Sequence, residues 1–191
     1  MNHPDPSAGP LADAVVALVS RIPATVEQPG ADVASRVAEL RRAAARRAAV
    51  VSGGLALPGG PVALVTLVPD LLAIWRIQAQ LVADIAGARG RAGSLTREQM
   101  LYCLFRHAAS HLLRDVVVRA GGRLVVRRLS GPAAVALASR VGVHLSREAV
   151  ARGVGRVVPG LGAAAVAAYA WWDTDRVART ADELLTREWM S

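Results

Sequence analysis

Two histidines and an aspartate follow one another at intervals of four residues near the middle of this 191-residue chain. If a single helix carries His107, His111 and Asp115, the three side chains lie within about 80° on one face. A histidine pair at this spacing can bind a metal ion, although a metal usually needs a further ligand that the sequence does not identify. Arginines flank the motif and would repel a cation. The alternative is that Asp115 accepts a hydrogen bond from His111 or pairs with Arg119.

No other stretch completes a catalytic signature. Ser110 is next to His111, but adjacent helix positions point apart and there is no Gly-x-Ser-x-Gly elbow. A phosphate loop of the Gly-Lys type is excluded because the chain has no lysine. Asp173 and Asp175 could form an acidic site, yet their position at the expected start of the last helix favours N-terminal capping. We therefore expect a protein that is not an enzyme and binds no cofactor.

Two polar residues belong to the helix expected after Pro69. Gln78 falls in the centre of its apolar face, whereas Gln80 and Asp84 fall on the opposite, polar face. A buried amide must find partners, so Gln78 is either part of a polar pocket or helix-pairing contact, or bonded to a backbone carbonyl at a turn. Asp70 directly follows Pro69, where a carboxylate can interact with the N–H groups of a first helical turn.

Two uncharged stretches, 48–69 and 157–172, are broken by glycine and proline. The first is long enough to span a membrane, but its Gly-Pro cluster argues against one straight helix because proline removes a donor and clashes with the preceding turn. We expect each stretch to form an apolar helical hairpin. The turns then contain two related pairs of residues: Pro58 with Gly59, and Pro159 with Gly160.

The composition indicates a single all-α domain built as a compact multi-helix bundle. Hydrophobic residues make up 53% of the chain and aromatic residues only 4%, so small side chains dominate the core. The one cysteine, Cys103, excludes an internal disulfide and fits a reducing compartment. Helices are expected over 11–20, 31–51, 61–68, 70–86, 96–120, 123–141 with a break at Gly131-Pro132, 144–158 and 173–189.

The formal net charge is +8, and all 23 basic residues are arginine. The arginines are spread over several helices and aromatic stacking platforms are scarce, which argues against nucleic acid as a partner. An anionic membrane surface attracts the same charge. The most basic helix is expected at 31–51, where the candidate surface contacts are Arg36, Arg41, Arg42, Arg46 and Arg47. The alternative for these arginines is an ordinary solvated helix face.

Two blocks of the chain resemble the EcsC family. They are LPGGPVALVTLVPDLLAIWRIQAQLVADIAGARG at 57–90 and VGRVVPGLGAAAVAAYAWWDTDRVARTADEL at 154–184. Together they place an EcsC-like helical domain at 31–188, after a flexible N-terminus at 1–10 and a short helix and linker at 11–30. The family's frequent Asn after the second glycine-rich turn is missing from AAYAWWDTD, so no role is transferred to it.

The resemblance implies a bacterial, all-helical protein of unassigned biochemistry and brings no catalytic residues with it. Combined with the charge and the apolar stretches, it favours a non-enzymatic, lipid-facing or partner-binding scaffold in the cytoplasm, at the inner face of the cell membrane. The partner is then an anionic membrane surface or a membrane protein. Two alternatives stay open: a small metal-dependent enzyme that uses the histidine motif, and a soluble adaptor whose apolar stretches form its core.

Overall fold

The computed structural model describes residues 10–55, 62–114, 116–120, 123–126, 129–153 and 161–187. Within these ranges the fold is an all-α bundle with one small β-hairpin, which confirms the expected fold class. The helices are α1 (Pro10–Ser20), α2 (Val33–Leu55), α3 (Val62–Ala88), the 3₁₀ turn η1 (Ala92–Ser94), α4 (Arg97–Phe105), α5 (Ser110–Leu113), α6 (Gly131–Gly153) and α7 (Leu161–Arg187). The strands are β1 (Val117–Ala120) and β2 (Arg123–Val126).

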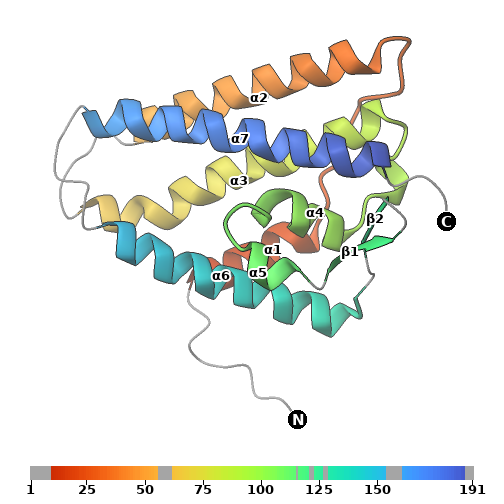
Figure 1. The fold of residues 1–191 in the computed structure, drawn as a ribbon. Helices are drawn as coiled ribbons and strands as arrows, with labels where there is room; N and C mark the ends of the chain where they lie inside the picture. Colours follow the sequence, from red (N-terminus) through yellow and green to blue (C-terminus); the bar gives the residue numbers. More distant parts are fainter. Residues whose placement is uncertain are drawn as a thin grey trace.

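The long helices form layers (Figure 1). α2 lies antiparallel to α7, and α3 packs against both. On the other side of the bundle α1 runs along α6, and α4 fills the space between the layers. Thus α2 and α3 pack as a helical hairpin, whereas α6 packs mainly against α1 and α7 mainly against α2. The predicted hairpin turns, with Pro58, Gly59, Pro159 and Gly160, lie outside the described residues.

The core lies where α3, α4 and α7 meet. Trp75 of α3 and Phe105 of α4 form an edge-to-face pair with ring centroids 5.2 Å apart, and both are buried. Small and branched side chains fill the remaining space, including Ile85, Val177 and Ala181, all fully buried. Close packing of alanine against larger residues explains how a chain with few aromatic residues builds this core.

Three long helices continue where the sequence predicted breaks. α3 passes through Pro69, so Asp70 lies more than two turns inside a helix and the first-turn role predicted for it is wrong. α6 is continuous through Val141, which is buried against the bundle. α7 is continuous from Leu161, so the N-terminal capping role predicted for Asp173 and Asp175 is wrong too. In each case packing against the rest of the bundle stabilises the helix, although its local sequence contains a helix-weakening residue or resembles a helix end.

The predicted helix over 96–120 begins as expected and then ends early. Thr96 and Gln99 form the capping box: the Thr96 hydroxyl accepts from the Gln99 N–H, and the Gln99 amide accepts from the Thr96 N–H. α4 nevertheless ends at Phe105, and β1 pairs with β2 in an antiparallel hairpin with Val117 opposite Val126. The prediction of helix here was wrong because two valine-rich runs separated by Gly-Gly are typical of a β-hairpin.

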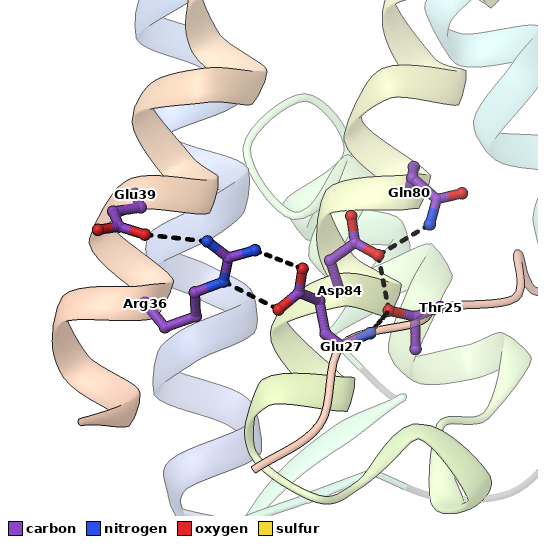
Figure 2. Close-up of polar contacts among 6 residues, drawn as sticks. All are labelled: Thr25, Glu27, Arg36, Glu39, Gln80 and Asp84. Atoms are coloured by element: carbon purple, nitrogen blue, oxygen red, sulfur yellow. Dashed lines mark hydrogen bonds and ion pairs between the residues drawn. The ribbon is translucent and has the colours of Figure 1, made fainter. Parts of the chain in front are cut away.

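Residues 21–32 form a strap without regular structure that crosses α3 (Figure 2). The Thr25 hydroxyl donates to Asp84 Oδ1 over 2.7 Å, and the Gln80 amide donates to the same oxygen and to the Ala24 carbonyl. Further along the strap, Glu27 forms an ion pair with Arg36 of α2, at 2.7 Å. The strap therefore covers the part of the polar face of α3 that carries Gln80 and Asp84.

Two glycines at the end of α3 have distinct physical roles. Gly90 ends the helix in the left-handed region, with φ of +70°, and its N–H donates to the Gly87 carbonyl. Gly87 lies under the strap, where a Cβ atom would come within 2.6 Å of the Glu27 carbonyl oxygen. Glycine at 87 thus permits the close approach of strap and helix.

Candidate functional site: a polar core beside an aromatic and arginine surface

A polar contact joins α3 and α7 in the interior. Gln78 is fully buried, and its amide nitrogen donates to Asp173 Oδ2 over 2.8 Å and lies 3.3 Å from the Thr174 hydroxyl. Its amide oxygen Oε1 is buried and has no hydrogen-bond partner among the residues that the structure describes. The structure therefore places Gln78 in a helix-pairing contact, one of the two roles that the sequence allowed.

His107 extends the polar region toward α4. Its Nε2 lies 3.0 Å from the Thr180 hydroxyl, and that hydroxyl donates to the Arg176 carbonyl over 3.0 Å. Because the hydroxyl proton is used on the carbonyl, His107 donates to Thr180 through a protonated Nε2. We call Gln78, His107, Asp173, Thr174 and Thr180 the polar core.

Burial shifts the two titratable groups of the polar core in opposite directions. It raises the pKa of the Asp173 carboxyl above its ordinary 3.8, against smaller lowering effects of the Gln78 hydrogen bond and of the charges on His107 and Arg176. Burial also lowers the pKa of His107 below its ordinary 6.5, and the charges on Arg176 and Arg106 lower it further. The hydrogen bond with the Arg176 backbone and the charge on Asp173 raise this pKa, but by less. Both shifts favour the neutral form, as expected for groups withdrawn from water.

The His107 shift predicts a loss of stability in acid. The unfolded chain takes up a proton on this histidine near pH 6.5 and the folded chain only at lower pH, so the free energy of unfolding falls as the pH drops below about 6.5. His107→Gln should remove that decrease, which urea titrations over a pH series would measure. His111→Gln is the control, because His111 is exposed. The same pH dependence in wild type and His107→Gln would contradict the assignment.

Next to the polar core, α7 exposes large aromatic side chains. Tyr169, Trp171 and Trp172 are 55%, 39% and 49% exposed, in a chain with only seven aromatic residues. Tyr169 and Trp172 have ring centroids 5.9 Å apart, and the Arg176 guanidinium lies 4.4 Å from the centroid of the Trp172 ring. This exposed cluster is what sequence reasoning missed. Its signal was the Tyr-x-Trp-Trp run, which holds three of the seven aromatic residues of the chain within four positions.

The five arginines predicted to contact an anionic surface lie in different surroundings. Arg36 pairs with Glu27 and Glu39, and Arg41 lies 3.1 Å from Asp175 of α7. Arg42 donates to the Ala38 carbonyl within its own helix. Arg46 and Arg47 are exposed, and within the described ranges no ion pair or hydrogen bond holds either guanidinium.

The structure separates the residues of the predicted metal site. His107 joins the polar core, whereas His111 lies beyond the end of α4 and stacks edge-to-face on His144 of α6, with centroids 4.7 Å apart. Asp115 lies outside the described residues. The common helical face that the motif assumed is therefore wrong, because the helix ends at Phe105. Across the described part of the chain, no three His, Cys, Asp or Glu side chains are grouped to hold a metal ion.

No family model, curated protein or solved structure matches the chain. The resemblance of blocks 57–90 and 154–184 to the EcsC family stays a prediction from the sequence.

Proposed function

We propose that this protein is a non-enzymatic, membrane-associated helical scaffold of EcsC type, held at the inner face of the cell membrane. The observation that carries the proposal is the exposed group Tyr169, Trp171 and Trp172 on α7. Amphipathic aromatic rings are the side chains most enriched at membrane–water interfaces. Three neighbouring exposed aromatic residues also exceed the scattered apolar side chains that are normal on a soluble surface.

The position of this group in the bundle supports the proposal. The C-terminal ends of α2 and α6 and the N-terminal ends of α3 and α7 lie at one end of the molecule (Figure 1). Three of these helix ends contain parts of the two uncharged stretches: 48–55 in α2, 62–69 in α3 and 161–172 in α7. The exposed aromatic residues begin about two turns into α7 from that same end. A bilayer in contact with this part of the bundle would meet both the aromatic group and the uncharged stretches.

Surface contact accounts for the structure better than a membrane-spanning helix. In the described part of the chain one helical window, Leu71–Ala88, is long and apolar enough to cross a bilayer, and more than half of it is buried within the bundle. Burial of that kind is typical of a core helix. The proposal therefore relies on exposed side chains of α7 and not on α3.

Vesicle flotation of the purified protein tests the proposal. We expect the protein to float with phosphatidylcholine vesicles that contain phosphatidylglycerol, with a blue shift of tryptophan emission. Trp171→Ser/Trp172→Ser should lower the affinity about tenfold or more, because burial of each large apolar side chain in the interface contributes about 1.5–3 kcal/mol.

The matched control is Val135→Ser, which removes an exposed apolar side chain from α6 on the opposite side of the bundle. It should float as the wild type does. A wild-type protein that stays entirely with the soluble fraction would overturn the proposed function, and so would equal flotation of the Trp171/Trp172 variant.

A further inference from the structure

One flank of α7 is turned away from α2. Asp175 marks the side of α7 that faces α2, because it pairs with an arginine of that helix at 3.1 Å. Thr180 marks a different side, because its hydroxyl lies 3.0 Å from Nε2 of His107, just after the end of α4. At about 100° per residue, Tyr169 and Arg176 fall within about 40° of Thr180. Both lie about 100° or more from Asp175, on the flank away from α2.

Trp172 joins this flank at its outward edge. It falls about 60° from Tyr169 and about 40° from Arg176 around the helix axis. Its ring centroid lies 5.9 Å from that of Tyr169 and 4.4 Å from the Arg176 guanidinium. We call Tyr169, Trp172 and Arg176 the Trp–Arg flank. Trp171 falls within about 40° of Asp175, so it belongs to the side of α7 next to α2.

The Arg176 guanidinium gives the Trp–Arg flank a positive charge. Within the described part of the chain no ion pair neutralises it, because the nearby carboxylates of α7 have other partners. Asp173 accepts from Gln78 in the polar core. The others pair with different arginines: Asp175 with Arg41 and Arg179, Asp182 with Arg89, and Glu183 with Arg106.

The stacking of Arg176 on Trp172 suits the binding of an anion. A guanidinium stacked on an aromatic ring keeps its N–H donors at the edge, where they can bind phosphate oxygens. Tryptophan and tyrosine rings have an apolar body and a polar tip, which suits the boundary between headgroups and acyl chains. Within about two turns of one helix, the Trp–Arg flank therefore offers groups for both layers of a bilayer interface.

We propose that the Trp–Arg flank binds the phosphate groups of anionic phospholipids, so that the bilayer meets α7 on the flank turned away from α2. This rests on the proposed membrane association and adds the headgroup chemistry, the residues and the orientation. Charge complementarity is the argument for this occupant. An unpaired guanidinium among exposed amphipathic rings fits an acidic lipid interface, whereas a second copy of the same flank would bring two unpaired cations together.

The first test compares two single variants of equal charge, Arg176→Gln on the flank and Arg46→Gln at an exposed position of α2. Circular dichroism should show both as helical as the wild type. Binding is measured to phosphatidylcholine vesicles with and without phosphatidylglycerol. On the anionic vesicles Arg176→Gln should lose about fivefold in affinity. Arg46→Gln should lose less than about twofold, because its charge lies away from the headgroups and is screened by salt. Equal losses would overturn the inference, since net charge alone would then explain binding.

The second test leaves every charge in place and measures the orientation. Trp171→Phe keeps Trp172, Trp172→Phe keeps Trp171, and the double variant gives the background of the other tryptophans. Emission is recorded on anionic vesicles whose acyl chains are brominated, because bromine quenches only a nearby tryptophan. We expect Trp171→Phe to be quenched nearly as the wild type is, and Trp172→Phe to lose most of the quenching above background. Equal or reversed losses would overturn the proposed orientation.

Other occupants of the flank would give different results. A wild-type dimer in light scattering that Arg176→Gln dissociates would overturn the inference in favour of self-association. Binding to polyuridylate but not to anionic vesicles would overturn it in favour of a single-stranded nucleic acid, for which stacked aromatic rings and arginine also provide contacts. Flotation on neutral vesicles that depends on Trp171 and Trp172 but not on Arg176 would leave the proposed function standing without this inference.

Discussion

Replacing Gly87 with alanine is expected to lower the free energy of unfolding by about 1–3 kcal/mol. The added Cβ would lie 2.6 Å from the Glu27 carbonyl oxygen and 2.8 Å from Thr25 Cγ2. The strap cannot move away freely, because Thr25 donates to Asp84 and the Ala24 carbonyl accepts from Gln80 (Figure 2). The closest clash is with a backbone oxygen, so no side-chain rotation relieves it. Urea denaturation followed by circular dichroism measures the change.

Gly54→Ala is the matched control for this substitution. Gly54 lies in α2 with open space around its Cα, and nothing would come within 4 Å of a new Cβ. Alanine there should be neutral or stabilise by up to about 1 kcal/mol, because it restricts the unfolded chain and favours the helix. If alanine at 87 were as harmless as alanine at 54, the strap would not be packed on α3 in solution.

The second large effect expected is a pH dependence of stability set by Asp173. Because burial raises the pKa of this carboxyl in the folded chain, the folded state holds its proton at pH values where the unfolded state has already lost it. The free energy of unfolding should therefore fall as the pH rises from about 3.8 through the folded pKa. For a single proton the slope reaches at most about 1.4 kcal/mol per pH unit.

Asp173→Asn should abolish this slope and make the protein more stable than wild type at neutral pH. The asparagine oxygen can still accept the hydrogen bond from Gln78, while the cost of burying a charge is gone. Urea titrations across the pH range provide the measurement. Asp175→Asn removes the same charge from the same helix but touches Arg41 and Arg179 instead of Gln78, so it should keep the wild-type slope. A destabilised Asp173→Asn protein at neutral pH would show that the charged carboxylate stabilises the fold.

Local signals in the sequence predicted several elements correctly. The helix at the N-terminus, the beginning of the arginine-rich helix α2 and the start of α4 appear close to where periodicity and capping residues placed them. The end predicted for α2 near Val51 was wrong, because the helix continues through Gly53 and Gly54 to Leu55. Thr96 and Gln99 form the predicted capping box because that motif uses only groups three residues apart. The two valine-rich strands around Gly121-Gly122 were equally visible in the sequence, and the helical interpretation overlooked a hairpin signal that β-branched residues provide.

Other features depend on residues far apart in the chain. Gln78 has polar partners only because α7, almost a hundred residues later, brings Asp173 and Thr174 beside it. Gln80 and Asp84 have the periodicity of a solvent-facing stripe, and only the path of the strap shows that they are covered.

The candidate functional residues also divide into features that follow from the sequence and features that depend on the tertiary structure. The sequence by itself determined the all-α class, the arginine-only positive charge and the uncharged stretches, because composition and short-range periodicity decide these properties. Only the tertiary structure decided that Arg36 and Arg41 are paired, whereas Arg46 and Arg47 have no ion-pair partner among the residues that the structure describes. It also decided that His107 and His111 have different surroundings and that Tyr169, Trp171 and Trp172 of α7 are exposed. The physical reason is that pairing and exposure depend on which helix packs against which face, and that choice minimises the free energy of the whole bundle instead of any single segment.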